Sequence, residues 1–508
     1  MPSVRRLLLI LEGMVILSAA TNHVLLAAQT AASQPAGEEM PATGVPESAD
    51  SPGDGNAAPT PTSSTQMPLE DSGPSEQVAT RPAETPPTTQ PSWVDRLKQP
   101  IPQFKWGADY RFRWEYLDNA FTLDRHTPDD EWSFLRLRPR VWSTITPTPG
   151  FDINSRFIWE SRQWFNPEER EGWDCQNGLF DILNAKVKIP DTPVTMTLGR
   201  QEIILGDGWL VLDGTPLDGS TTLYFDAARF TFDLKDIKTT ADVIYIQQWS
   251  DTDKWLPPIN DRDLAVTEQN EIGAILYVSN KSIDRTTIDG YFIYKGDEDV
   301  LPNGDDGDIY TFGGRFVRDW TDHITTRSEG AFQFGERNRR DVCAFGTTNR
   351  ATYFFRDPLK NQLRLNYEFL SGDNPGSKGQ DEAFDPLWGR WPQWSELLVY
   401  TMATETRVGE MTNLHRIGFG WQAEPTDKLT LAADYHLLFA DENTFRDRPG
   451  FSKRERFRGQ LLTGIIRYKF NRFLSGHIIG EYFWPGDYYA APRDDPAAYL
   501  RMELMFTF

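Results

Sequence analysis

The sequence predicts a transmembrane antiparallel β-barrel of about 18 strands that follows a disordered N-terminal linker. Three observations predict this all-β fold class. From Lys105 onward, segments of about 10 to 14 residues alternate between apolar and polar side chains, which is the period of a β-strand. The connections between these segments alternate between short and long, and the last segment alternates up to a terminal phenylalanine.

The first 92 residues differ in composition from the rest of the chain. Residues 1–28 are predicted to be a signal peptide, because Arg5 and Arg6 precede an apolar stretch that ends in small residues. Residues 29–92 are rich in Pro, Thr and Ser and cannot bury enough surface to fold. We expect a disordered periplasmic linker, either a plain spacer or a segment that reaches a periplasmic export partner. The barrel is assigned to residues 93–508.

Composition excludes several classes of protein. The formal net charge is −22 over 508 residues, which argues against nucleic acid as a partner. Beyond the N-terminus, no run approaches the roughly 18 to 20 apolar residues of a membrane helix. A barrel remains compatible with the negative mean hydropathy, because its lipid-facing residues are interleaved with polar ones.

The first alternating segment shows the two faces expected of a barrel strand. The apolar face carries Trp106, Ala108, Tyr110, Phe112, Trp114 and Tyr116, and the polar face carries Lys105, Asp109, Arg111, Arg113 and Glu115. A soluble sandwich with one wet face would alternate in the same way. Aromatic residues near the segment ends instead favour the girdles of a membrane barrel.

The connections indicate two unlike ends. Short turns are predicted at 146–150, 189–193, 233–236 and 319–322, and long polar loops at 163–179, 201–222, 250–269, 297–307 and 372–411. This asymmetry is typical of short periplasmic turns and long extracellular loops in the bacterial outer membrane.

The strand count follows from closure of the sheet. Nineteen candidate segments cannot close an antiparallel barrel with both ends on one side, and 396–408 is the weakest of them. Placing 396–408 within an extracellular loop leaves eighteen strands, which make room for an aqueous channel in a single chain, so we expect a monomer. The last segment, ending at Phe508, resembles the signal read by the outer-membrane assembly machinery and would pair with the first strand.

If the apolar faces contact lipid, the polar faces line the lumen. The basic residues predicted to line the substrate path are Arg111, Arg113, Arg136, Arg138, Arg140, Arg156, Arg200, Arg364, Arg467 and Lys469, and Lys186, Lys188, Arg229, Arg315, Arg327 and Arg416 are also predicted to face inward. Inward acids are predicted to be fewer, at Asp109, Glu115, Glu160, Asp289, Glu329, Glu368, Asp434 and Glu481.

A positive lumen suits an acidic polysaccharide. The planar guanidinium binds a carboxylate through two parallel hydrogen bonds, and rings of charge lower the barrier for an anion that enters a pore. The alternative is that the charges only pair across strands to hold a polar wall together. The ladder of Arg136, Arg138 and Arg140 favours an anionic ligand, because three like charges on one strand face need many partners.

Four groups of residues carry a resemblance to a known family. They are 109–113 (DYRFR), 134–140 (FLRLRPR), 198–201 (LGRQ) with 206–208 (GDG), and 371–373 (SGD) with 384–389 (FDPLWG). In this order along one barrel they resemble the alginate-export outer-membrane porins. The resemblance implies an eighteen-stranded barrel whose electropositive constriction passes a polyuronate outward, with Arg111, Arg136, Arg138 and Arg200 as the best lumen positions. The long linker departs from the family pattern and leaves the periplasmic partners open.

Other chemistry finds little support in the sequence. None of the six histidines has metal-ligand spacing to another His or Cys, so we expect no metal and no cofactor. Ser475, His477 and Glu481 share one strand face, but residues two apart on a strand lie about 7 Å apart, too far for a nucleophile and its base. We therefore expect no catalytic residues. Cys175 and Cys343 could form a disulfide in an exported protein.

The loop at 372–411 holds Phe384, Trp388, Trp391 and Trp394, which are costly to expose to water. We expect it to pack over or into the extracellular mouth and gate it. Alternatively, its aromatic faces stack on sugar rings.

The sequence thus favours an outer-membrane channel that passes an anionic polysaccharide or small anions by passive diffusion. An outer-membrane enzyme, and a structural or adhesive barrel without specific transport, stay as alternatives from other classes.

Overall fold

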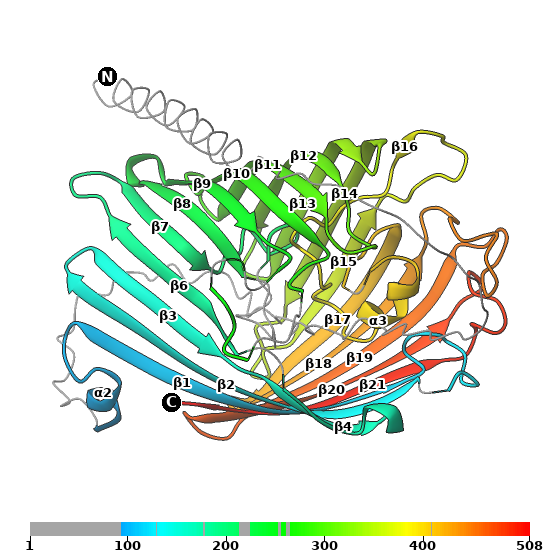
Figure 1. The fold of residues 1–508 in the computed structure, drawn as a ribbon, viewed down its shortest axis with the longest axis horizontal. Helices are drawn as coiled ribbons and strands as arrows, with labels where there is room; N and C mark the ends of the chain where they lie inside the picture. The colour runs from blue at the N-terminus through cyan, green and yellow to red at the C-terminus, as the bar shows by residue number, and fades with distance from the viewer. Residues whose placement is uncertain are drawn as a thin grey trace, which may run out of the picture. The chain divides into compact units, whose positions relative to one another are not determined.

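The computed structural model describes residues 93–508 except 129, 176–177, 213–223, 252–253, 255, 261–264 and 408. The predicted signal peptide (1–28) and linker (29–92) lie outside the described residues. The described chain forms a closed antiparallel barrel of eighteen strands, as the alternation predicts (Figure 1).

The strands follow one another around the ring in chain order. The first seven strands are β1 (Phe104–Asp118), β2 (Glu131–Thr148), β3 (Phe151–Ile158) with β4 (Ser161–Asn166), β5 (Gly172–Cys175) with β6 (Leu179–Lys188), β7 (Val194–Gln201), β8 (Phe225–Leu234) and β9 (Thr239–Gln248). The other eleven are β10 (Gln269–Asn280), β11 (Thr286–Asp299), β12 (Gly307–Asp319), β13 (Ile324–Arg337), β14 (Arg340–Phe354), β15 (Gln362–Leu370), β17 (Leu414–Thr426), β18 (Leu429–Phe439), β19 (Phe457–Lys469), β20 (Leu474–Pro485) and β21 (Ala497–Thr507). β21 pairs with β1, and this pairing closes the barrel.

Two of the eighteen strands are interrupted. β3 and β4 both pair with β2 and act as one strand, broken at Trp159 and Glu160. β5 pairs with β4 and β6 pairs with β3, so these two also form one strand. The break turns Glu160 into the barrel, where its side chain is fully buried among arginines.

The remaining elements are short. They are α2 (Trp93–Lys98), η1 (Glu168–Arg170), η2 (Lys235–Ile237), β16 (Gln380–Asp381), α3 (Leu398–Thr401) and η3 (Met402–Thr404). The weak candidate strand at 396–408 contains α3 and η3, so its assignment to a loop is confirmed. Among the described helices, none is long and apolar enough to cross a membrane, which does not bear on crossing by strands.

Short turns and long connections lie at opposite ends of the barrel, with two differences from the prediction. The long loop predicted at 163–179 is wrong: β4 and β5 continue the hairpin there, and only a short connection around η1 remains. At the long-loop end, β13 and β14 are joined by a tight turn at Asn338 and Arg339, whose φ angles are 53° and 64°.

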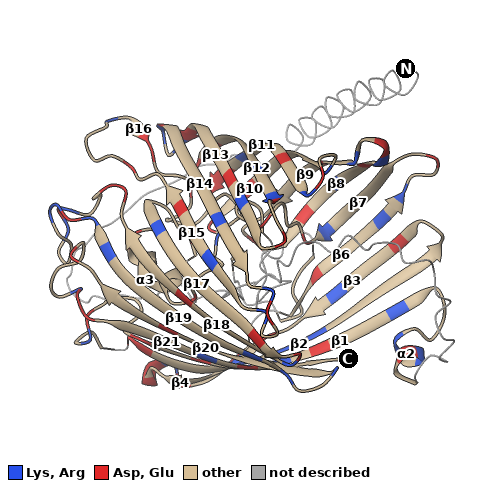
Figure 2. Cartoon of the chain, turned by 180° about the vertical axis from the view of Figure 1, so that it is seen from behind, with Lys and Arg blue, Asp and Glu red and all other residues tan. Residues whose placement is uncertain are grey.

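The two faces of the strands differ as predicted. On β1, Tyr110 and Phe112 are 42% and 44% exposed on the outer wall, whereas Arg111 and Arg113, which alternate with them, are fully buried. Figure 2 shows basic and acidic positions within many strands and not in the loops alone. Cys175 and Cys343 are both exposed, on β5 and β14, and no disulfide joins them.

Candidate functional site

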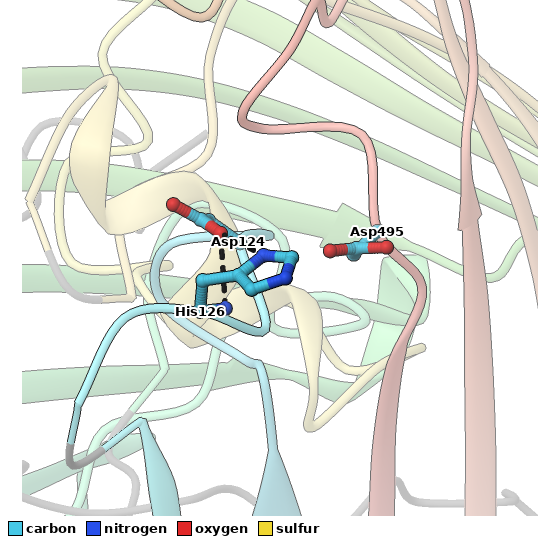
Figure 3. Close-up of side chains that lie close together, drawn as sticks. All are labelled: Asp124, His126 and Asp495. Atoms are coloured by element: carbon cyan, nitrogen blue, oxygen red, sulfur yellow. Dashed lines mark hydrogen bonds and ion pairs between the residues drawn. The ribbon is translucent and has the colours of Figure 1, made fainter.

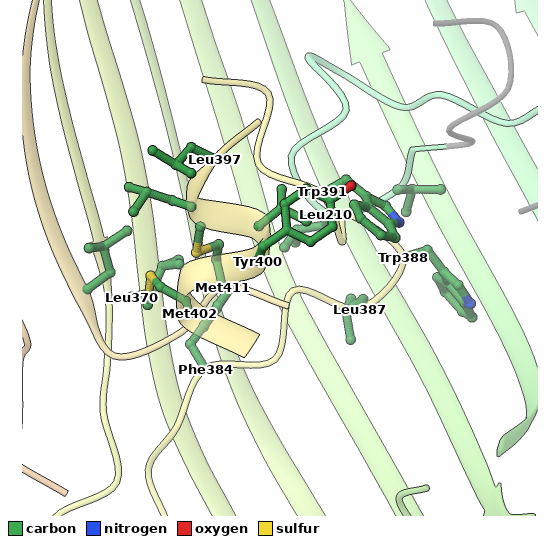
Figure 4. Close-up of a cluster of buried hydrophobic side chains, with 14 of the residues drawn as sticks. Leu210, Leu370, Phe384, Leu387, Trp388, Trp391, Leu397, Tyr400, Met402 and Met411 are labelled. Carbon is green, nitrogen blue, oxygen red and sulfur yellow. The ribbon is translucent and has the colours of Figure 1, made fainter. Parts of the chain in front are cut away.

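The connection between β15 and β17 folds into the barrel. We call its residues 384–411 the strap. Figure 4 shows one buried apolar cluster, in which most labelled side chains come from the strap itself and pack with Leu210 of the β7–β8 connection and Leu370 of β15. Phe384, Trp388 and Trp391 are at most 6% exposed, and Trp394 is partly buried. The predicted gating loop therefore packs inside the barrel; whether it gates stays a prediction.

The strap crosses the whole lumen. At one end, the indole Nε1 of Trp388 donates to Glu271 on β10 at 2.8 Å. Seven residues later, Ser395 contacts Glu481 on β20. Eight strands separate β10 from β20 along either side of the ring, so the two anchors lie on opposite walls. Seven extended residues span at most about 24 Å, and the side chains of Trp388 and Glu271 at one end and Glu481 at the other complete the crossing.

Glu481 holds the far end of the strap. Its carboxylate accepts hydrogen bonds from Ser395 Oγ at 2.7 Å and from the backbone N–H groups of Glu396 and Leu397 at 3.0 Å each. Arg501 on β21 also bonds Glu396 at 3.0 Å. All these side chains are buried, and direct hydrogen bonds join the strap to the wall.

Glu481→Ala is expected to loosen the strap and make the open channel noisy. The change leaves three donors without their carboxylate, and each hydrogen bond to a charged group is worth about 1.5–3 kcal/mol. Single-channel recordings should show frequent flicker between conductance levels. Glu424→Ala is the control, because Glu424 pairs with exposed Lys360 at the short-turn end, far from the strap. An unchanged current trace in the Glu481 variant would contradict the clamp.

Ion pairs with neighbouring loops hold the strap at the long-loop end. Arg390 bonds Glu268 at 2.8 Å, and Arg407 bonds Asp305 at 2.5 Å. Burial alone would raise the pKa of Glu268, but Arg390 and Arg407 outweigh burial and lower this pKa to about 2. A carboxylate with a lowered pKa stabilises the fold above its ordinary pKa and loses this contribution as pH falls toward the lowered value. The ion pair between Arg390 and Glu268 therefore persists at neutral pH.

An arginine row lies on one side of the strap. It comprises Arg315 on β12, Arg327 on β13, Arg350 on β14, Arg364 on β15 and Arg416 on β17. All five line a cavity of about 140 Å³ between the wall and the strap. Acids on the same wall, among them Glu368 and Asp434, also line this cavity and temper its charge.

The sheet register brings two arginines of the row face to face. Arg327 and Arg350 are directly opposite each other on β13 and β14. Like charges at such positions destabilise a sheet. Acceptors beside the facing pair offset this repulsion, because Arg327 bonds Asp207 of the β7–β8 connection and Arg350 Nε donates to Asn366, each at 3.0 Å. Further along the row, Arg364 and Arg416 bond Asp434 and Glu368 at 3.0 Å.

The strap presents an aromatic face to the arginine row. The guanidinium of Arg416 lies 4.7 Å from the ring centroid of Trp394. The imidazole of His436 lies 5.3 Å from the same indole. His436 is 1% exposed, lines the cavity, and has no hydrogen-bond partner for either ring nitrogen among the described residues. The site therefore combines cations, aromatic faces and spare hydrogen-bonding capacity.

The opposite side of the strap is filled by a second group of arginines. Arg111, Arg113, Arg136 and Arg138 are at most 2% exposed. Arg111 faces Arg138, and Arg113 faces Arg136, across β1 and β2. Three carboxylates bond this group. Glu160 bonds Arg111 and Arg136, Glu115 bonds Arg136 and also Arg501, and Glu503 bonds Arg113. These contacts are of the kind expected under the alternative interpretation, in which inward charges pair across strands to hold a polar wall together.

The other predicted lumen cations lie closer to the short-turn end or under loops. Arg140 and Arg156 line a larger cavity of about 720 Å³ on the β1–β8 side, where they bond Asp109 and Asp181. Arg200 is buried between Asp226 and the ring of Tyr224. Arg467 is half-buried on β19, and Lys469 is exposed as the last residue of that strand. Their part in transport stays a prediction.

Sequence reasoning missed Arg350 and the acids that the loops supply. Arg350 lies within β14, where side chains point alternately inward and outward, so the strand period could have placed it on the inner face. Asp207, Glu396 and Glu405 reach wall arginines from loops. Loop residues carry no period that would assign them to a wall.

Three residues of the types that can ligate a metal ion lie together outside the lumen. Asp124, His126 and Asp495 come together in two loops at the long-loop end (Figure 3). The His126 side chain is 87% exposed, and Asp495 already pairs with Arg125 at 3.0 Å. Nothing else in the described structure points to an ion there, so the expectation of no metal site is not revised.

Comparisons with known proteins agree with this architecture. The alginate export family model matches residues 103–502. No curated protein matches the sequence significantly. Among solved structures, OpdQ of Pseudomonas aeruginosa is 12% identical with a TM-score of 0.52, over 80% of this chain and 99% of that chain. OccAB1 of Acinetobacter baumannii is 10% identical with a TM-score of 0.51, over 80% of this chain and 96% of that chain.

A third solved structure is described together with a ligand. OccK2 (OpdF) of P. aeruginosa, in complex with glucuronate, is 9% identical with a TM-score of 0.50, over 79% of this chain and 98% of that chain. At these identities the likeness concerns the fold alone. Since the family model covers most of the sequence and the barrel is that of a porin, this chain belongs to the alginate export family and is an outer-membrane channel.

Proposed function

We propose that this channel passes an anionic polysaccharide, such as an alginate-like polyuronate, or a smaller carboxylated solute, by passive diffusion. The observation that carries the proposal is the arginine row. Its five guanidinium groups follow one another on neighbouring strands and line one cavity. Arginine binds carboxylates through its planar fork and stays charged in any environment.

The aromatic face opposite the row supports a sugar acid over a simple inorganic anion. A pyranose ring has apolar C–H faces that can lie on an indole such as Trp394, while its carboxylate meets arginine. His436 has two ring nitrogens available for sugar hydroxyls, and a buried polar group without a partner calls for such an explanation. The glucuronate complex of OccK2 shows that a barrel of similar fold binds a uronate.

The carboxylates that bond the arginine row favour passage of the solute over tight binding. Conduction requires binding that is favourable enough for entry and weak enough for release. Carboxylates such as Asp434 and Glu368 already bond the row, so a passing uronate exchanges partners and is not captured by bare charges. Arg111, Arg113, Arg136 and Arg138 act, in this proposal, through the positive field of a buried wall.

Reversal potentials in planar bilayers test the proposal. In a KCl gradient the purified protein should prefer chloride, and glucuronate should interrupt the current at concentrations where glucose does not. The matched sugar pair separates carboxylate recognition from size. A preference for potassium, or equal effects of glucuronate and glucose, would overturn the proposal.

A further inference from the structure

A second loop brings a carboxylate onto the arginine row. Between β7 and β8, the turn Gly206-Asp207-Gly208 folds into the lumen. Asp207 Oδ1 accepts hydrogen bonds from Arg315 Nη1 at 2.7 Å and from Arg327 Nη1 at 3.0 Å. One loop oxygen therefore bridges two neighbouring members of the row.

The turn is built to fit this position. Gly206 and Gly208 have φ angles of 59° and 73°, a region that favours glycine. A Cβ on Gly206 would lie 2.9 Å from Tyr277 Oη and 3.2 Å from Arg315 Nε. From the other side, Gln393 of the strap donates to the carbonyl oxygens of Asp207 and Gly208 at 3.0 and 3.2 Å. The carboxylate is thus pressed onto the row by close packing on both sides.

The contact remains accessible from the cavity. The Asp207 side chain is 30% exposed, and those of Arg315 and Arg327 are 13% and 20% exposed. All three residues line the cavity next to the strap. Arg315 also bonds Asp289 at 2.7 Å, so it keeps a wall carboxylate if Asp207 moves away. Exchange of one carboxylate for another at this place therefore leaves Arg315 with a wall partner, while the displaced Asp207 carboxylate is partly exposed to the cavity.

We propose that Asp207 is an internal competitor: a loop carboxylate that occupies Arg315 and Arg327 and is displaced by the carboxylate of a passing uronate. The inference rests on the proposed function, since it concerns the same arginine row. Asp207 and a uronate present the same group to the same guanidinium nitrogens, so each must leave for the other to bind. The residue sets how long a solute stays, and hence the balance between selectivity and release.

Asp207→Asn tests this role with glucuronate as the probe. The amide keeps the size of the side chain and removes its charge, so the residence time of glucuronate in single-channel recordings should rise about tenfold, equivalent to about 1.4 kcal/mol. Asp207→Glu restores the carboxylate and should return the residence time toward that of the native protein. An unchanged or shorter residence time in Asp207→Asn would overturn the inference.

Glu202→Gln is the matched control. Glu202 belongs to the same loop, its side chain is 26% exposed, and it pairs with Arg156 in the other cavity. Arg156 keeps its bonds to Asp181 at 2.9 Å. This variant therefore removes one negative charge from the same loop but leaves the carboxylate of Asp207 on Arg315 and Arg327. Glucuronate residence should change less than twofold. A rise equal to that of Asp207→Asn would show a general charge effect and refute competition at the row.

The two proposals fail in different ways. If the native channel shows neither anion preference nor interruption by glucuronate, the proposed function fails. If the native channel responds to glucuronate but Asp207→Asn responds equally, only the competitor role fails. Heat-modifiable migration on gels checks that each variant is a folded barrel, so a misfolded variant is not mistaken for an inactive one.

Discussion

Replacing Arg327 and Arg350 together with glutamine should lower the chloride-to-potassium permeability ratio at least about fivefold at low ionic strength. One unit charge acting on an ion at about 7 Å contributes about 0.6 kcal/mol even at the permittivity of water. Two such charges sum to about 1.2 kcal/mol, or about sevenfold, for chloride alone, and potassium changes in the opposite direction. Salt screens the effect, so it should shrink toward molar KCl. Reversal potentials at low and high salt measure both trends.

The same double variant should still fold as a barrel, which heat-modifiable migration on gels measures. The change removes two facing like charges from β13 and β14, and Asp207 keeps its hydrogen bond from Arg315. Arg111→Gln with Arg138→Gln is the matched control, since these two also face each other but are at most 1% exposed. If the second pair controls selectivity and the first does not, the passage runs along β1 and β2 instead of the arginine row.

Replacing the strap by a short Gly/Ser linker should raise single-channel conductance several-fold. Eighteen strands enclose an aqueous channel unless something fills it, and here the strap runs from Glu271 to Glu481 across the lumen. The variant should also lose discrimination between glucuronate and glucose, because removing the strap removes the indole of Trp394 that faces the arginine row. Current–voltage recordings on single channels measure the conductance directly.

A loop change that spares the strap serves as the control. Residues 446–448 are exposed in the connection between β18 and β19, and replacing them with glycine should leave conductance within about 20% of the native value. If removal of the strap leaves conductance unchanged, the strap does not limit the passage. In that case the cavity beside it is not the constriction.

The fold could be predicted because a barrel strand is a local pattern. Alternation placed Arg111, Arg113 and Arg364 on the inner face, and closure of the sheet decided between eighteen and nineteen strands. The period does not tell how high in the lumen a residue lies or what lies opposite it. It also failed at 163–179, where polar residues of β4 and β5 continue a hairpin and were assigned to a loop.

The candidate site could be predicted only in part. Arg315, Arg327, Arg364 and Arg416 have inward positions in the alternation, but nothing in the alternation groups them apart from Arg111 and Arg136. That division is made by the strap, whose path depends on long-range contacts such as Trp388 with Glu271. Asp207 and the clamp at Glu481 follow from the same tertiary packing.

The account depends on the passage running between the strap and the arginine row. A structure of the protein with a bound uronate oligosaccharide tests this most directly. Carboxylates are expected within hydrogen-bond distance of Arg315, Arg327 or Arg350, with a sugar ring against Trp394. An oligosaccharide bound along β1 and β2, on the other side of the strap, would contradict the account.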